Sequence, residues 1–204
     1  MYIQGPDATN WQGLVIFCRM ITDGPEPGPH RYGRKVNSVI PFVSLVGYSN
    51  SGKTTVTAGL IRILKSRGYR VAALKHAAHG YTVDSPGTDS WQYAQAGADQ
   101  VYIVGPDSIT RHEYNQTEKA LPEILAEIEN VDIVLVEGFK REIGPKIEVY
   151  RQYYSPDRIS AGGQLLAVVS DVSVTGEIPQ FSCDQLEGLA DLIVQNINLK
   201  RCSG

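Results

Sequence analysis

The amino-acid sequence predicts an α/β fold in which a doubly wound, mostly parallel sheet is flanked by helices. Two observations carry this prediction. From residue 38 onward, short apolar runs typical of buried strands alternate with segments whose apolar residues recur at helical spacing. The residues directly after the apolar runs are polar, as expected where the carboxyl ends of parallel strands form a ligand site. At 204 residues and 42% apolar composition, the chain is long enough for one such domain.

The first predicted strand and helix flank a glycine-rich loop. Residues 39–46 form the apolar run, and residues 55–66 have apolar side chains at helical spacing before a stop at Gly68. Between them, residues 47–54 match the pattern G-x-x-x-x-G-K-[ST]. In such a loop the backbone N–H groups and the helix N-terminus surround a diphosphate. Because strand, loop and helix occur in the required order, we predict a phosphate-loop NTPase fold.

The remaining elements continue the alternation. The sequence predicts four further strands and three further helices, the strands at residues 69–75, 100–104, 131–136 and 165–169 and the helices at 89–96, 117–129 and 184–195. The strands at 131–136 and 165–169 are nearly continuous apolar runs, as expected for strands covered on both faces.

Residues 1–36 differ in composition from the rest of the chain. They are rich in proline and glycine, and their only apolar cluster is residues 14–17. A segment that buries so little apolar surface cannot offset the entropy of ordering it. We therefore predict a poorly ordered extension, or a single strand lying on the core, followed by a nucleotide-binding domain at residues 37–204.

Charge and composition exclude several classes of protein. The net charge of −3 and the pI near 5.8 argue against a dedicated nucleic-acid binder. The sequence has no apolar run of 18 residues and no secretory signal pattern, so we expect no membrane partner. Three scattered cysteines do not form a disulfide framework or a C-x-x-C pair. A cytoplasmic protein is expected by elimination.

The predicted nucleotide site centres on the phosphate loop. Lys53 is expected on the β and γ oxygens of a triphosphate, and the Thr54 hydroxyl on Mg²⁺. Glu137, at the end of an apolar strand, fits the acidic residue that acts near Mg²⁺ or orients the attacking water. Lys53 and Glu137 are thus the predicted catalytic residues, whereas Asp132 should lie at the opposite edge of the sheet. The predicted nucleotide contacts in the loop are Gly47, Ser49, Asn50, Ser51, Gly52, Lys53, Thr54 and Thr55.

Lys75 and His76 follow the second predicted strand, with His79 three residues later. Three interpretations stay open for this loop: an active-site role without metal, a structural role, or a zinc or nickel site. The metal site is incomplete with two histidines unless another subunit contributes. Asp84 or Asp89 could also reach Mg²⁺ from the same loop.

Residues 38–195 resemble the molybdopterin-guanine dinucleotide biosynthesis protein B family. The resemblance rests on four blocks in the right order, namely residues 47–55, 75–98, 136–140 and 145–148. Within the second block, Lys75-His76-Ala77-Ala78-His79 and Pro86-Gly87-Thr88-Asp89-Ser90 carry the likeness. The family usually has lysine where Thr88 stands and often histidine where Ala78 stands, so this loop departs from the pattern.

The resemblance implies a homodimeric GTPase with weak intrinsic hydrolysis that uses GTP and Mg²⁺. It also implies a role in assisting the guanylyltransferase that joins molybdopterin to GMP. Asp171, which follows the strand at 165–169, is by position the candidate that reads guanine. No intact N-K-x-D signature is present, so a helix cap or loop acid is the alternative interpretation. Lys140, Arg141 and Lys146 are expected either to face an anionic pterin phosphate or partner protein, or to form a solvated basic loop.

Three other functions remain compatible with these residues. A small-molecule kinase would use the same loop together with an acceptor pocket and a base. A nickel or zinc metallochaperone would carry metal on His76 and His79. A nucleotide-gated adaptor would bind the triphosphate with negligible catalysis.

Overall fold

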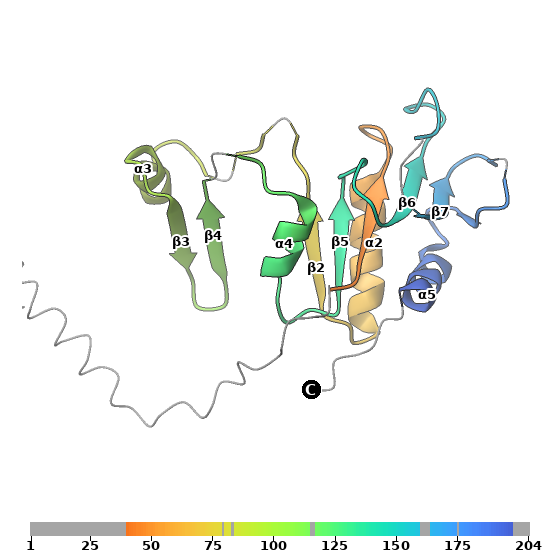
Figure 1. The fold of residues 1–204 in the computed structure, drawn as a ribbon, viewed down its shortest axis with the longest axis horizontal. Coiled ribbons are helices and arrows are strands. Elements are labelled where there is room, and N and C mark those ends of the chain that lie inside the picture. Colours follow the sequence, from red (N-terminus) through yellow and green to blue (C-terminus); the bar gives the residue numbers. More distant parts are fainter. Residues whose placement is uncertain are drawn as a thin grey trace, which may run out of the picture. The chain divides into compact units, whose positions relative to one another are not determined.

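The computed structural model describes residues 40–78, 80–82, 84–114, 117–159, 164–174 and 176–197. The strands and helices of these residues, drawn in Figure 1, are β1 (Phe42–Val46), α2 (Lys53–Ser66), β2 (Val71–Lys75), α3 (Asp89–Gln95), β3 (Gln100–Val104), β4 (Ile109–Glu113), α4 (Leu121–Glu127), β5 (Ile133–Glu137), β6 (Pro145–Tyr150), β7 (Gln164–Ser170), β8 (Gln180–Phe181) and α5 (Leu186–Asn196). The predicted extension at residues 1–36 lies outside the described residues, so its order stays a prediction.

Six strands form one sheet in the order β2-β5-β1-β6-β7-β8, and every neighbouring pair is parallel. After β1 the chain first builds the β2 side of the sheet and later returns to the β6 side. The carboxyl end of β1 is therefore the switch point at which a parallel α/β sheet forms its ligand crevice. The doubly wound α/β prediction is confirmed.

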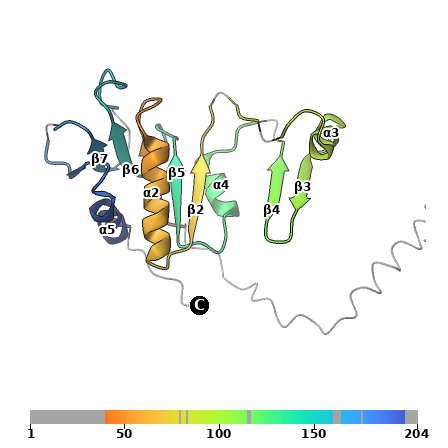
Figure 2. The same cartoon turned by 180° about the vertical axis from the view of Figure 1, so that it is seen from behind.

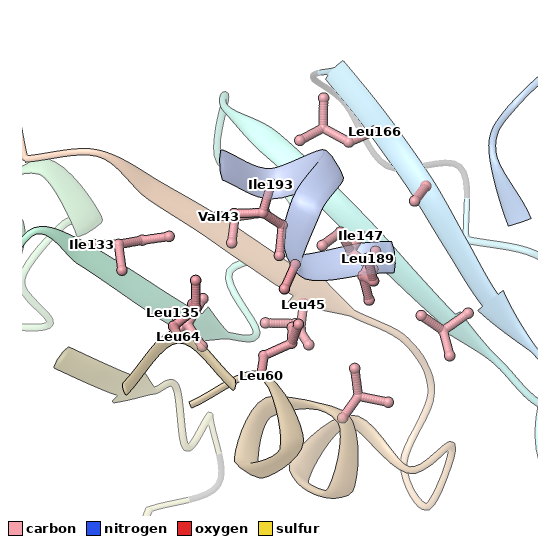
Figure 3. Packing of buried hydrophobic residues seen from close by; sticks show 14 of the residues in the cluster. Val43, Leu45, Leu60, Leu64, Ile133, Leu135, Ile147, Leu166, Leu189 and Ile193 are labelled. Carbon is pink, nitrogen blue, oxygen red and sulfur yellow. The ribbon is translucent and has the colours of Figure 1, made fainter. Parts of the chain in front are cut away.

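Alternate residues of the central strands fill two separate cores. One face of β1 and β5 contributes Val43, Leu45, Ile133 and Leu135, which pack with α2 and α5. Figure 3 shows Leu60 and Leu64 of α2 and Leu189 and Ile193 of α5 meeting these side chains. The other face packs against α4, and its residues include Val134, Val136, Leu121 and Leu125. Seen from behind in Figure 2, α2 and α5 lie in front of the sheet.

Helix α2 follows the loop at the carboxyl end of β1 and packs against the core. Val56, Leu60 and Leu64 recur every four residues and are fully buried, so one face of the helix lies on the sheet. Gly59 lies on the face toward α5, where an added Cβ would come 2.3 Å from Cδ1 of Leu186. This glycine therefore permits the close packing of α2 and α5.

The strand predicted at residues 100–104 exists, but it does not belong to the large sheet. It pairs antiparallel with β4 in a two-stranded hairpin, with Gln100 opposite Glu113 and Val104 opposite Ile109. Strand β4 was missed because its sequence, Ile-Thr-Arg-His-Glu, lacks an apolar run. Both strands of the hairpin leave most of their side chains exposed, and only β3 has enough apolar residues to be identified from the sequence.

Two strands of the large sheet, β6 and β8, were also missed. In β6 the charged Lys146 and Glu148 alternate with apolar residues, and both charges are nonetheless buried.

Helix α4 is shorter than the predicted 117–129, since the backbone at Ala120 is extended and the helix begins at Leu121. None of the described helices is long and apolar enough to cross a membrane.

Candidate phosphate-binding site

The glycine-rich loop lies at the carboxyl end of β1, in the crevice of the sheet. Strand β1 ends at Val46 and α2 begins at Lys53, so the loop connects the two directly. A Cβ on Gly47 would lie 2.4 Å from the Val149 carbonyl oxygen and 2.6 Å from Oγ of Ser51. Only glycine fits at this position, where the loop runs against the end of β6.

The backbone of the loop has the shape of an anion cradle. Asn50 and Gly52 have φ values of 61° and 92°, in the left-handed region, and the Ser51 N–H donates to the Tyr48 carbonyl. The first N–H groups of α2 have no partner within the helix and carry its positive dipole end. Ser51 is fully buried, and its Oγ has no hydrogen-bond partner among the described residues. A phosphate oxygen would satisfy such a hydroxyl, so the loop fits a phosphate.

Lys53 lies half-buried in this loop, and its Nζ donates to the Tyr48 carbonyl at 2.6 Å. Burial lowers the pKa of Lys53, and although Glu137 opposes this effect, the nearby cations Lys140 and Lys75 lower the pKa further. Nζ of Lys140 lies 5.3 Å from the centre of the Tyr48 ring. Three ammonium groups therefore surround the loop and favour an anion there.

Thr54 and Glu137 come together across the crevice. The Thr54 hydroxyl donates to Oε2 of Glu137 at 3.0 Å, and Nζ of Lys75 lies 3.7 Å from Oε1 of the same carboxylate. Glu137 is the last residue of β5, one residue further than the predicted strand, and it is paired in register with Leu45 and Lys75. A hydroxyl and a carboxylate are oxygen ligands of the kind that Mg²⁺ prefers.

Asp132 lies at the opposite edge of the sheet, as predicted. Its carboxylate accepts from the backbone N–H of Arg70 at 2.7 Å and pairs with the Arg70 guanidinium at 3.2 Å. Asp132 is thus engaged near the amino end of β5, away from the phosphate loop.

His76 follows β2 beside the acidic strand end. Its backbone N–H donates to the backbone carbonyl of Glu137 at 2.8 Å. Its ring stacks on Phe139 with the ring centroids 4.4 Å apart, and Nε2 of the ring lies 2.6 Å from Oε1 of Glu118. His79 lies outside the described residues. Among the residues that the structure describes, no group of three or more His, Cys, Asp or Glu side chains could hold a metal ion.

Asp84 and Asp89 lie at the start of α3. The Thr88 hydroxyl, which caps this helix, donates to Asp84 at 2.7 Å. Hydrogen bonds from Ser90 and Thr88 lower the pKa of Asp84. Asp89 occupies the first turn of the helix, where a negative charge complements the dipole.

Asp171 follows β7 and lines an open hollow of ≈370 Å³ at the ends of β7 and β8. Phe181, Ser182 and Gln185 also line this hollow. The Asp171 carboxylate accepts from the backbone N–H of Gln152 at 3.4 Å and lies 3.6 Å from Nη1 of Arg151. Aromatic, hydroxyl, amide and carboxylate groups together can bind a flat polar ring.

Lys146 contradicts the prediction of a basic loop that faces solvent or a partner. It lies in β6, is 1% exposed, and its Nζ donates to the Lys140 carbonyl at 2.7 Å. Burial lowers the pKa of this ammonium. Lys140 and Arg141 are exposed, so only these two keep the predicted accessibility.

Arg151 is the residue of this edge that the sequence analysis missed. It comes directly after β6, with its guanidinium near Gly52, Asp171 and Cys183. A cation at the end of a strand is the signal that marked Lys75. It was overlooked at residue 151 because β6 itself was not recognised.

The sheet order, the loop and its setting define a phosphate-loop NTPase fold. Residues 42–171 match the family model of molybdopterin guanine dinucleotide synthesis protein B, and the chain belongs to this family.

Curated relatives and solved structures agree with this assignment. The chain is 32% identical over 164 residues to the molybdopterin-guanine dinucleotide biosynthesis adapter protein of Escherichia coli K12, covering 78% of this chain and 94% of that protein. It is also 32% identical to the adapter protein of Haemophilus influenzae, over 78% of this chain and 90% of the relative. A crystal structure of molybdopterin-guanine biosynthesis protein B is 29% identical with a TM-score of 0.60, covering 76% of this chain and 98% of the other. The structure of Bacillus subtilis MobB, at 24% identity, supports the fold, with a TM-score of 0.62 and coverage of 77% and 98%.

Proposed function

We propose that this chain binds GTP with Mg²⁺, hydrolyses it weakly, and acts as an adapter in molybdopterin-guanine dinucleotide biosynthesis. The observation that carries the nucleotide part is the pairing of Thr54 with Glu137 beside the complete phosphate loop. The relatives named as adapter proteins, matched over nearly their whole length, support the pathway.

Different residues of the loop would bind different parts of the nucleotide. Lys53 supplies a point charge to the β and γ phosphates, and the loop N–H groups and the Ser51 hydroxyl donate to phosphate oxygens. Thr54 and Glu137 would hold Mg²⁺, which when bound neutralises the phosphate charge. When Lys53 turns to the phosphates, the Tyr48 carbonyl would keep its hydrogen bond from the Ser51 N–H.

Weak hydrolysis fits the surroundings of Glu137. Its carboxylate is already shared between the Thr54 hydroxyl and the Lys75 ammonium, so it is a poor base for an attacking water. We infer that Glu137 contributes mainly by orienting the metal or its water. The protein would then work chiefly through the nucleotide it holds, not through fast turnover.

Asp171 is proposed to read guanine. Its carboxylate, in the hollow at the ends of β7 and β8, could accept from N1–H and the exocyclic amine of the base. Phe181 of the same hollow offers an aromatic edge or face to the purine.

The proposed partners are molybdopterin, the guanylyltransferase that attaches GMP, and a second copy of this chain, in the cytoplasm. Exposed apolar side chains on the hairpin, including Tyr102, Val104 and Ile109, support the homodimer because such patches mark contact surfaces. Lys140, whose ammonium lies over the Tyr48 ring, and the exposed Arg141 would face an anionic pterin phosphate. The net charge of −3 supports partners other than nucleic acid.

Titration calorimetry tests the proposal directly. GTP, GDP and ATP are titrated into the full chain with and without Mg²⁺, and the GTP series is repeated in the presence of molybdopterin. We expect GTP to bind at least about tenfold tighter than ATP, since a site built to pair with the base edge rejects a base that lacks the partners. Equal affinity for ATP and GTP would contradict guanine selectivity. No triphosphate binding at all would overturn the nucleotide function.

A nickel or zinc metallochaperone is the less favoured alternative. His76 contacts Glu118 and Phe139, and among the described residues no group of three or more His, Cys, Asp or Glu side chains could hold a metal ion with it. A small-molecule kinase would need an acceptor pocket beside the γ-phosphate end of the loop. The hollow at Asp171 lies on the β7 side instead.

A further inference from the structure

Arg151 holds its guanidinium beside the N-terminus of α2. Strand β6 pairs with β1 up to Val46 opposite Glu148 and then continues past the end of β1, so residue 151 flanks the loop. A Cβ built on Gly52 would lie 3.9 Å from both Nε and Nη2 of Arg151. Gly52 is the residue that precedes the first turn of α2.

Among the described residues, the partners of Arg151 use only a small part of its hydrogen-bonding capacity. A guanidinium has five N–H donors. Among the described residues, Nη2 donates to Sγ of Cys183 at 2.7 Å, and Nη1 lies 3.6 Å from Oδ2 of Asp171. A thiol is a weak acceptor, and 3.6 Å is longer than a hydrogen bond. The side chain is 27% exposed, so its remaining donors are accessible to a ligand.

The positive charge of Arg151 also lies close to the positive end of the α2 helix dipole. The N-terminus of a helix carries a positive partial charge, so a cation beside it is unfavourable unless an anion lies between them. Lys53, Lys75 and Lys140 surround the same loop from the β5 side. Arg151 completes this cationic ring from the β6 side, where Asp171 also lies.

We propose that Arg151 is a phosphate-binding residue that contacts the α and β phosphates of the nucleotide from the β6 side of the loop. This inference rests on the proposed function and deepens it. A planar guanidinium can bind two phosphate oxygens at once, which a lysine cannot do. Its contacts with Asp171 and Cys183 place the same side chain between the phosphate loop and the base hollow.

The test uses Arg151→Gln and Arg151→Lys in the full chain, with Arg67→Gln as the matched control. Arg67, at the end of α2, pairs with Glu187 and Asp191 of α5. Its replacement therefore measures the effect of losing an arginine outside the crevice. GTP, GDP and guanosine are titrated into each variant in Mg²⁺, and melting temperatures are recorded. Arg151→Lys keeps the charge, so a measurable protein remains if Arg151→Gln folds poorly.

We expect Arg151→Gln to weaken GTP and GDP alike by about 10- to 100-fold, the worth of a charge-assisted bidentate contact. Arg151→Lys should fall between this variant and the parent, and guanosine affinity should stay within about twofold, because the nucleoside lacks phosphates. Unchanged GTP affinity in both Arg151 variants would overturn the inference while leaving the proposed function intact. A parent protein that binds no nucleotide would instead overturn the proposed function and this inference with it.

Discussion

The two sides of β1 use charged residues in different ways. On the β5 side, Glu137 and Lys75 are the last residues of two neighbouring strands. Glu137 accepts from the Thr54 hydroxyl, and the Lys75 ammonium pairs with the same carboxylate. On the β6 side, Lys146 and Glu148 lie inside the strand and are 1% exposed. They bind backbone outside the sheet, since Lys146 donates to the Lys140 carbonyl and Glu148 accepts from the Ile159 N–H.

This difference separates ligand binding from loop positioning. Charges at the strand ends on the β5 side are accessible to a phosphate and a metal ion. Buried charges on the β6 side instead hold the neighbouring loops, Lys146 at Lys140 and Glu148 at Arg158 and Ile159. A buried charge is costly unless it is paired, so these two residues are expected to be critical for stability.

The largest expected effect is therefore on stability and falls on the β6 side. Glu148→Ala should reduce the free energy of unfolding by about 3–5 kcal/mol, because it removes the partner of Arg158 and of the Ile159 N–H. The control is Asp191→Ala, which breaks a surface ion pair with Arg67 and should cost under about 1 kcal/mol. Urea unfolding of both variants measures the difference. Equal losses would show that the buried and the surface ion pair contribute equally to stability, and would contradict a special role for buried charge on the β6 side.

The next effect concerns the phosphates. Lys53→Ala should weaken triphosphate binding by at least about 100-fold, since it removes a charge from the β and γ oxygens. The fold should persist, because burial lowers the pKa of Lys53 and the ammonium is desolvated at a cost in the parent. Lys65→Ala, an exposed lysine on the last turn of the same helix, is the control. Calorimetry that gives the same affinity for both variants would refute the phosphate-loop assignment.

Much of this edge could be predicted from sequence because the β5 side follows simple rules. An apolar strand that ends in an acid, and a loop with fixed glycine and lysine spacing, identified Glu137, Lys53 and Thr54. On the β6 side, the alternation of Lys146 and Glu148 with Ile147 and Val149 hid a buried strand. Arg151 was missed for the same reason, since a residue cannot be placed at the end of an unrecognised strand. Single-sequence patterns report burial through apolar residues, and paired buried charges break that link.

A third prediction concerns base reading on the β7 side. Asp171→Asn should weaken the binding of GTP by about tenfold or more and strengthen the binding of xanthosine triphosphate, because the amide donates where the carboxylate accepted. Affinities for both nucleotides are measured by calorimetry in Mg²⁺. The control is Asp184→Asn. Asp184 is an exposed acid that accepts a hydrogen bond from Ser182, and its replacement should leave the preference for GTP unchanged. If Asp171→Asn keeps the preference for GTP, another group reads the base.

The smallest expected effect is at His76, on the β5 side. His76 stacks on Phe139 and pairs with Glu118, and an added Cβ on Gly138 would come 2.8 Å from its Cβ. The side chain therefore braces the loop after Glu137. We expect His76→Ala to reduce support of guanylyl transfer in a reconstituted cofactor assay by about 2- to 10-fold, the worth of one hydrogen-bonded contact.

A matched histidine separates this role from metal transport. His112→Ala, in β4, removes a ring that stacks on Tyr114 and should leave guanylyl transfer unchanged. Purified parent protein, dialysed without chelator, should carry no stoichiometric zinc or nickel by elemental analysis, because two histidines cannot supply the four ligands of a closed zinc site. One metal ion per subunit or per dimer, lost in His76→Ala but kept in His112→Ala, would make His76 a metal ligand. The β5 side would then transport metal as well as bind phosphate, and the metallochaperone alternative would replace the adapter role.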